Sequence, residues 1–342
     1  MNISRRNFLK LSCLALLTGS LTGKLGCNLA AGPPDSPECL DYPGLPDSPK
    51  IDILEKEIET HLENNSKLNE TFDLYKGVLA VHLAYMDEIE VSLPFKEKEI
   101  RNLFRNKRYV LNQHKLKFDP PIFKEILHSI AGVMKEKNPL TPESFMNLLE
   151  VQEFKTGNVQ EFLSRATSCD KLEMENYIQE IGMDKRAKVD KELISFVTFA
   201  SASPFYKRCR EEVKSITDFS LWRLGFCPVC GQTATIAKHR QEDGARIMEC
   251  WLCHAEWYHP LMECPYCDNN DQSKLRFFYV NGDNSRQVHV CQKCKHYLKV
   301  IDGRAMNKEA TLEVEDIATG YLDVVAKKEG YNPPAQNISV YY

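Results

Sequence analysis

The sequence lacks the short glycine motifs that mark many nucleotide-binding sites and serine nucleophiles. No Gly-x-x-x-x-Gly-Lys, Gly-x-Gly-x-x-Gly or Gly-x-Ser-x-Gly occurs in its 342 residues, so no phosphate-binding loop or nucleophile turn is indicated. The chain also lacks a strong excess of either charge. Its 44 Lys and Arg residues against 48 Asp and Glu give a net charge of −4, which provides no basic field for nucleic acid or acidic lipid.

The apolar stretch near the N-terminus is too short to be a stable transmembrane span. It runs from Leu11 to Leu21 and includes polar residues, whereas a spanning helix needs about 20 consecutive apolar residues. It follows the sequence SRRNFLK at Ser4–Lys10, which matches the twin-arginine export pattern at every fixed position. Residues 1–30 are therefore predicted to be a twin-arginine signal segment, recognised by the twin-arginine export machinery. The alternative is an ordinary cytosolic N-terminus.

Residues 31–50 form the next predicted region. They contain six prolines, a composition that favours an extended linker over a packed element. Signal cleavage and lipidation stay open, because no clean Ala-x-Ala motif precedes Ala30, and Lys24 interrupts the lipoprotein-like box at Cys27. The twin-arginine route exports folded proteins, which suits a protein whose cofactor is inserted before export.

Residues 51–222 show helical periodicity and few strand-like runs. Pro120 opens one predicted helix. Thr141-Pro142 and Ser203-Pro204 have the composition of helix starts, and the second predicts a helix over Phe205–Val213. We expect an all-α domain of six to eight helices that serves as a binding scaffold. Four single histidines of this region are expected at the surface or capped in the core rather than as ligands: His61, His82, His114 and His128.

Cysteine is the residue whose placement is most informative. Eight of the 13 cysteines form four Cys-x-x-Cys pairs, whereas the other five are scattered singly. The paired cysteines are Cys227, Cys230, Cys250, Cys253, Cys264, Cys267, Cys291 and Cys294. Spacers of 19 and 23 residues join the first pair to the second and the third pair to the fourth. This spacing is typical of metal sites rather than of a disulfide framework, so we predict that all eight cysteines bind metal.

Each half of the cysteine-rich region predicts a strand hairpin that brings two Cys-x-x-Cys turns together. Strand-like runs lie at 233–237 and 246–248 in the first half, and at 275–280 and 287–290 in the second. Four thiolates around one tetrahedral ion form a closed site for zinc or iron, and the sequence does not decide between them. We expect one metal module at residues 223–262 and another at residues 263–310.

Three roles are compatible with such sites: a passive structural support, a rubredoxin-like redox centre, or a fold that presents a protein-binding surface. Disulfides formed after export are a further alternative to metal. Nucleic-acid binding is disfavoured, because residues 223–310 hold twelve Lys and Arg against ten Asp and Glu, a net charge of only +2. The five histidines of the region are expected at the surface or beside the ligands: His239, His254, His259, His289 and His296. Trp251, Trp257 and Tyr258 are expected to cover the first site.

Six segments of the chain resemble one protein family. They are Phe226–Gly231 (FCPVCG), Arg246–Trp257 (RIMECWLCHAEW), Cys264–Cys267 (CPYC), Cys291–Lys299 (CQKCKHYLK), Asp316–Asp323 (DIATGYLD) and Glu329–Tyr331 (EGY). Through them the chain is similar to the formate dehydrogenase accessory protein family FdhE over residues 51–331. The resemblance is specific in the cysteine-rich region and the helix that follows it, and loose in the helical region.

The resemblance implies an α+β fold. An all-α N-terminal domain at residues 51–222 is followed by tandem rubredoxin-like or zinc-ribbon modules, and by a C-terminal helix and tail at residues 311–342. It also implies a protein that is not an enzyme and that binds the catalytic subunit of respiratory formate dehydrogenase during maturation. Two metal ions are expected, with iron favoured by the resemblance, and a rubredoxin-like electron-transfer protein is the alternative. Family members are generally cytoplasmic, whereas the twin-arginine segment predicts a periplasmic or membrane-associated location.

Overall fold

The computed structural model describes residues 30–31, 45, 51–93, 95–111, 116–117, 119–137, 171–180, 182, 191–280, 282–306 and 310–333. The SRRNFLK segment, most of the expected linker and the helix start at Thr141-Pro142 lie outside these residues, as do His114, Cys13, Cys27, Cys39 and Cys169. Within the described parts, no helix combines the length and the apolar character needed to cross a bilayer.

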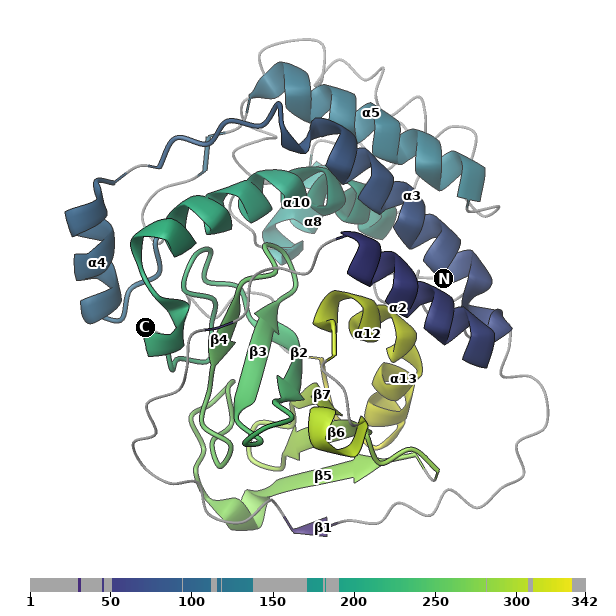
Figure 1. The fold of residues 1–342 in the computed structure, drawn as a ribbon, viewed down its shortest axis with the longest axis vertical. Coiled ribbons are helices and arrows are strands. Elements are labelled where there is room, and N and C mark those ends of the chain that lie inside the picture. Colours follow the sequence, from purple (N-terminus) through teal and green to yellow (C-terminus); the bar gives the residue numbers. More distant parts are fainter. Residues whose placement is uncertain are drawn as a thin grey trace.

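Six described α-helices precede the cysteine-rich region and lie on one side of a β-sheet (Figure 1). They are α2 (Ile51–Asn64), α3 (Asn69–Met86), α4 (Glu97–Arg105), α5 (Pro120–Lys137), α8 (Lys171–Glu180) and α10 (Lys191–Ile216). Helix α10 is central, since it contacts α3, α4, α5 and α8. Its Val197 and Phe205 are fully buried in the same core as Phe123 of α5. Burial of each such side chain stabilises the fold by about 2–3 kcal/mol.

The helix that Pro120 was expected to open is α5. The side chain of Asp119 caps its first turn, because Oδ1 accepts a hydrogen bond from the amide of Ile122 at 3.2 Å. Pro120 itself needs no amide hydrogen at this position, since the first amides of a helix have no intrahelical acceptor. Local sequence signals were sufficient to locate this helix.

The helix start predicted at Ser203-Pro204 is wrong, because α10 runs through both residues. Proline lacks an amide hydrogen, so Pro204 leaves the carbonyl of Ala200, four residues earlier, without its helical donor. His82 of α3 replaces that donor, with Nε2 at 2.8 Å from the Ala200 carbonyl oxygen. Because a carbonyl oxygen only accepts hydrogen bonds, Nε2 carries the hydrogen. A contact between two helices therefore compensates for the proline inside one of them.

A sheet of seven described strands carries the cysteine-rich region, in the order β1-β5-β6-β7-β2-β3-β4. The strands are β1 (Ala30–Ala31), β2 (Ala234–His239), β3 (Arg246–Cys250), β4 (Glu256–Tyr258), β5 (Leu275–Tyr279), β6 (Arg286–Cys291) and β7 (Tyr297–Asp302). The groups β2-β3-β4 and β5-β6-β7 are each antiparallel. They join through parallel pairing of β2 with β7. Each half thus has a third strand that the predicted hairpins lacked.

Two short helices after the sheet pack on its centre and second half and connect it to α2 (Figure 1). Helix α12 (Leu312–Ala318) packs Val314 against Ile58 and other side chains of α2 and α3. Helix α13 (Gly320–Lys328) packs Leu322 against Val288 of β6. The remaining short elements are η1 (Ser66–Leu68), η3 (Phe219–Leu221), η4 (Gln272–Lys274) and α11 (Gly303–Met306). Helices beside a mixed sheet confirm the predicted α+β class.

Candidate metal centres

The four Cys-x-x-Cys turns share one backbone hydrogen-bond pattern. In each, the amide of the first cysteine donates to the carbonyl five residues later, and its own carbonyl accepts from the amide four residues later. The N···O distances of the first bond are 2.8, 2.9, 2.9 and 3.1 Å in Cys227–Gln232, Cys250–Ala255, Cys264–Asn269 and Cys291–His296. Those of the second are 3.0, 3.0, 3.0 and 2.9 Å in Cys227–Gly231, Cys250–His254, Cys264–Asp268 and Cys291–Lys295. The repeat in the sequence is therefore also a repeat in backbone geometry.

The residue after each second cysteine adopts a left-handed backbone conformation. Its φ is +74° at Gly231, +54° at His254, +51° at Asp268 and +61° at Lys295. Glycine adopts this conformation readily, whereas a residue with a Cβ is strained there. The sequence signal for such a turn is present at Gly231 alone. At the other three positions the two hydrogen bonds of the turn hold the strained conformation in place.

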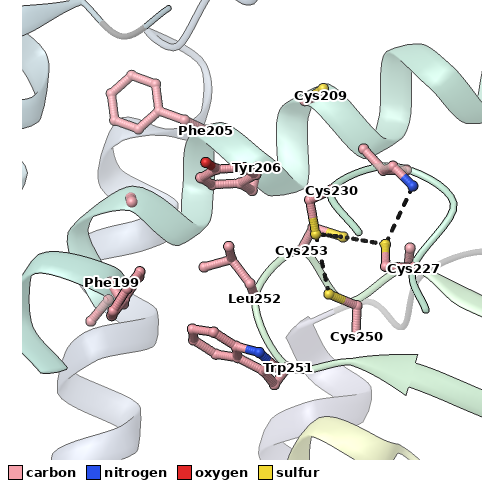
Figure 2. Packing of buried hydrophobic residues seen from close by; sticks show 14 of the residues in the cluster. Phe199, Phe205, Tyr206, Cys209, Cys227, Cys230, Cys250, Trp251, Leu252 and Cys253 are labelled. Atoms are coloured by element: carbon pink, nitrogen blue, oxygen red, sulfur yellow. Dashed lines mark hydrogen bonds between the residues drawn. The ribbon is translucent and has the colours of Figure 1, made fainter. Parts of the chain in front are cut away.

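The first two turns bring four thiols together beside α10 (Figure 2). The Sγ atoms of Cys227, Cys230, Cys250 and Cys253 all lie within 4.8 Å of one another. The Sγ–Sγ distance is 3.5 Å for Cys227–Cys253, 3.5 Å for Cys230–Cys250 and 3.8 Å for Cys230–Cys253. Sulfurs bound at about 2.3 Å to a tetrahedral ion lie about 3.8 Å apart, whereas disulfide sulfurs lie about 2.0 Å apart. The arrangement therefore fits a four-coordinate ion, and the four thiols are not joined as disulfides.

The third and fourth turns assemble a second group of four thiols. The Sγ atoms of Cys264, Cys267, Cys291 and Cys294 also lie within 4.8 Å of one another. The Sγ–Sγ distance is 3.7 Å for Cys264–Cys294 and 3.8 Å for Cys267–Cys291. The structure thus brings the eight cysteines singled out in the sequence together as two sets of four, one for each half of the sheet.

The ionisation of the thiols differs within each group. Burial raises the pKa of Cys227 and of Cys230 well above the usual thiol range. Burial also opposes ionisation of Cys253, but hydrogen bonds from the other three thiols lower its pKa well below that range. In the second group, a hydrogen bond from Cys264 lowers the pKa of Cys294 to about 3. Full ionisation of either group requires a cation, because only metal ligation stabilises four adjacent thiolates.

Helix α10 holds the second turn of the first group through two polar side chains. Ser203 Oγ donates a hydrogen bond to the carbonyl oxygen of Leu252 at 2.9 Å. Arg210 Nη1 donates to the carbonyl oxygen of His254 at 3.3 Å. Sequence reasoning missed both residues, because Ser203 and Arg210 lie 49 and 44 residues from their acceptors in the chain.

The segment after α4 holds the first turn in the same way. The amides of Val110 and Leu111 donate to the carbonyl oxygens of Pro228 and Val229, each with an N···O distance of 3.0 Å. Backbone bonds carry no side-chain signal, so the sequence did not indicate this contact. The helical region therefore contacts both turns of the first four-sulfur group.

Two of the three aromatic residues expected over the first site contact its surroundings. The Trp251 ring meets Phe199 of α10 edge-on, with 5.4 Å between ring centroids (Figure 2), and its Nε1 donates to Gln232 Oε1 at 3.1 Å. Trp257 Nε1 donates to the carbonyl oxygen of Leu224 at 2.8 Å. Tyr258 departs from the expectation, because it lies in a separate cluster with Ala245 and Ile247. Trp251 thus connects the first site to the helical core.

The five histidines of the region stand outside both four-sulfur groups. Burial lowers the pKa of His254 and of His259 to about 3, so both rings are neutral near pH 7. His239 and His289 lie ring edge to face, with 5.3 Å between centroids. His296 is half-buried beside Tyr266, with 5.7 Å between ring centroids. None of the five is exposed, so the expectation of a surface position is wrong. The alternative, a position beside the ligands, is confirmed for His296, whose side chain hydrogen-bonds Cys294.

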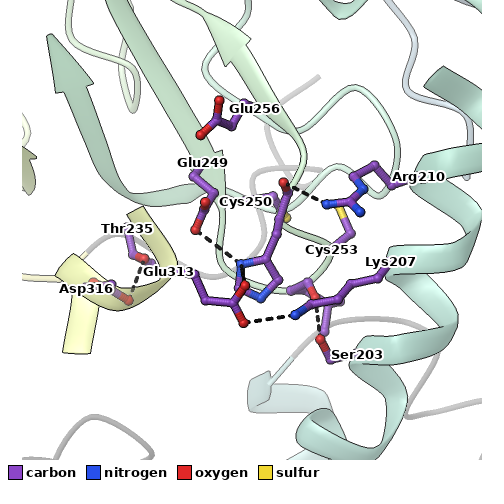
Figure 3. A network of polar contacts seen from close by, with 12 residues as sticks. Ser203, Lys207, Arg210, Thr235, Glu249, Cys250, Cys253, Glu256, Glu313 and Asp316 are labelled. Atoms are coloured by element: carbon purple, nitrogen blue, oxygen red, sulfur yellow. Dashed lines mark hydrogen bonds and ion pairs between the residues drawn. The ribbon is translucent and has the colours of Figure 1, made fainter. Parts of the chain in front are cut away.

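A polar network joins α10, the first site and α12 (Figure 3). Lys207 Nζ lies 2.9 Å from Glu313 Oε1, and His254 Nδ1 lies 3.2 Å from Glu249 Oε1. Burial raises the pKa of Glu313, but the nearby His254 and Lys207 lower it by more. Lys207 and Glu313 are 106 residues apart in the chain, so no local sequence pattern indicates the pair.

The fold and the two four-sulfur groups define a class of protein, in which a helical region is attached to tandem four-cysteine ribbons that share one sheet. No protein-family model matches the sequence. The chain is 22% identical to the FdhE homologue of Aquifex aeolicus (strain VF5), over 80% of this chain and 89% of that protein. It is 30% identical to the FdhE homologue of Stutzerimonas stutzeri (strain A1501), over 33% of this chain and 37% of that protein.

A solved structure has the same fold. The crystal structure of the FdhE protein from Pseudomonas aeruginosa superposes with a TM-score of 0.59 at 17% sequence identity, covering 87% of this chain and 98% of that chain. The sequence relatives support the resemblance to the FdhE family that the cysteine motifs had indicated.

Proposed function

We propose that the chain is an accessory factor for the maturation of respiratory formate dehydrogenase and is not itself an enzyme. The observation that supports this most is the pair of four-sulfur groups. Four cysteines fill a tetrahedral coordination sphere, which leaves no position for a substrate. The family relationship supports the accessory role, and we infer that the action is binding of the catalytic subunit of formate dehydrogenase.

The proposed factor binds two metal ions, one in each four-sulfur group. The ligands are Cys227, Cys230, Cys250 and Cys253 for the first ion, and Cys264, Cys267, Cys291 and Cys294 for the second. Iron is the ion that the family resemblance favours and zinc is the alternative, since both accept four thiolates in tetrahedral geometry. Each ion would cross-link two turns, and such a cross-link contributes about 10 kcal/mol or more to folding in small thiolate sites.

The affinity of the chain for the catalytic subunit is expected to depend on the first four-sulfur group. We would tag the C-terminus in the native host and identify the proteins that co-purify with wild type and with Cys250→Ser/Cys253→Ser. Wild type is expected to recover the catalytic subunit and the double variant to lose it, because the two turns that contact the helical region then lose their cross-link. The control is Cys209→Ala, which alters a buried thiol of α10 outside both groups. Failure of wild type to recover that subunit would contradict the proposal.

We also propose that the protein is exported by the twin-arginine route and acts at the periplasmic face. The motif at Ser4–Lys10 supports this location, and a cytoplasmic location, usual for the family, is the alternative. Replacement of Arg5 and Arg6 by Lys is expected to retain the protein in the cytoplasm, because it removes the paired guanidinium groups of the signal. Fractionation of cells that produce each form measures this directly. The same cytoplasmic distribution for both forms would show that the motif does not direct export.

A rubredoxin-like electron carrier is the second candidate. The half-buried state of Cys267 and Cys294 favours it, since electron exchange requires an accessible centre. A reversible one-electron titration of the purified iron protein would support electron transfer. A zinc protein with no redox signal would rule it out.

A further inference from the structure

The two four-sulfur groups are built alike but are covered differently. Cys227, Cys250 and Cys253 have no exposed surface and Cys230 is 7% exposed. In the second group, Cys264 and Cys291 are also buried, but Cys267 and Cys294 are half-buried. The accessible thiols are the second members of their pairs, so they correspond to Cys230 and Cys253 of the first group.

The helical region accounts for part of this difference. Around Cys253 it contributes Ser203 and Arg210, whose hydrogen bonds end on the backbone of that turn. Around Cys230 it contributes the ring of Tyr109. This ring lies so close to Gly231 that a Cβ added to the glycine would be 2.7 Å from it. The turn of Cys294 is held instead from the C-terminal side, where the amide of Asn332 donates to the carbonyl oxygen of Lys295 at 2.7 Å.

The side chains between the paired cysteines show that the difference is built into the sequence. Trp251 and Leu252 stand between Cys250 and Cys253, and both are buried against the helical core. Gln292 and Lys293 stand at the corresponding positions between Cys291 and Cys294, and Lys293 is exposed. A buried apolar pair in one module and a polar pair with one exposed member in the other are the choices expected of a covered turn and a more open one.

We propose that the second four-sulfur group exchanges its metal ion with ligands from solvent, whereas the first retains its ion as a cross-link between two turns that the helical region covers. This inference rests on the metal binding proposed above. An incoming donor, such as a thiolate or a chelator nitrogen, binds the ion as Cys267 or Cys294 leaves as a thiolate. No electron is transferred in this substitution.

The two groups would then respond differently to metal supply. Loss of the second ion loosens the turns at 264–268 and 291–295, which lie at the surface. Tyr266 is the one residue of those turns that packs against the helical core, so the core keeps most of its packing. The occupancy of the second group would therefore alter one exposed surface without unfolding the protein.

Chelation kinetics test the exchange. The full chain, loaded with two equivalents of zinc, is mixed with excess 4-(2-pyridylazo)resorcinol and zinc transfer is followed by absorbance. We expect two phases of one equivalent each, the second slower by about tenfold or more, because release from the first group requires local opening of the core. Cys294→Ser is expected to remove the fast phase alone, and Cys209→Ala to keep both. A single phase for both equivalents would overturn the inference.

Alkylation of the wild-type protein gives a second readout that needs no folded variant. N-ethylmaleimide is added with the chelator, and modified peptides are identified by mass spectrometry. The four cysteines of the second group are expected to react in step with the fast phase, before those of the first group. Earlier or equal labelling of Cys227 and Cys253 would contradict the assignment. A wild-type protein that binds no zinc or iron would refute the metal sites themselves, and this outcome is distinct from two ions released together.

Discussion

At the scale of single residues, the backbone of the Cys-x-x-Cys turns decides which substitutions the sites tolerate. Gly231 has a φ of +74° and lies against the ring of Tyr109. The other three turns place His254, Asp268 and Lys295 in the same conformation. Gly231 alone combines a left-handed backbone with a close approach by an aromatic ring, so it is the turn residue least able to accept a side chain.

Substitution of Gly231 by Ala is expected to destabilise the protein by roughly 1–3 kcal/mol, from backbone strain alone. The contact at 2.7 Å between the new Cβ and the Tyr109 ring adds to this loss. Chemical denaturation of the metal-loaded protein measures the change. The control is Gly320→Ala, since Gly320 begins α13, has no heavy atom within 4 Å of a new Cβ and is expected to tolerate it. Equal stability of Gly231→Ala and wild type would contradict the strain argument.

The cysteine groups were predictable at this scale, whereas the burial of the histidines was not. Two cysteines separated by two residues meet in one turn, so the pairing of neighbours follows from local geometry alone. The burial of His239 and His259 depends on strands and loops that are distant in sequence. The expected position of Tyr258 was wrong for the same reason. Its neighbour Ala245 lies in the connection between β2 and β3, outside the turns of the first four-sulfur group.

At the scale of elements, contacts between distant segments override local sequence signals. Pro204 has the composition of a helix start, but α10 continues through it with the help of His82. Strand β4, at Glu256–Tyr258, has three residues, too few to show a period. The parallel pairing of β2 with β7 joins two modules in a register that neither module specifies by itself. Helix existence was therefore more predictable than helix boundaries or strand order.

The compensation between Pro204 and His82 predicts a coupling between substitutions of these residues. His82→Ala leaves the Ala200 carbonyl without a donor and is expected to cost about 1–3 kcal/mol. In a Pro204→Ala background a new amide of α10 supplies that donor, so the same change is expected to cost about 1 kcal/mol less. Free energies of unfolding for the four proteins measure the coupling. Ser201→Ala is the control, since its hydroxyl bonds the carbonyl of Val197 and should add independently to Pro204→Ala. Additive costs for His82 and Pro204 would contradict the compensation.

At the scale of the whole molecule, the first four-sulfur group lies where three parts of the chain meet. Helix α10 and the segment at 108–111 contact its turns. The pair Lys207–Glu313 then connects α10 to α12 beside it. The second group belongs to the sheet and its C-terminal helices. The proposed accessory factor thus has one buried metal centre and one accessible metal centre. They lie in two modules that share the same Cys-x-x-Cys repeat.

The metal content of the full chain tests the central claim most directly. Native mass spectrometry of the purified protein is expected to show two metal ions per chain, and one ion in Cys264→Ser/Cys267→Ser. The variant keeps the first group intact because its four ligands lie in other turns. A wild-type chain with one ion or none, or with its paired cysteines oxidised to disulfides, would contradict the account of two independent four-thiolate centres.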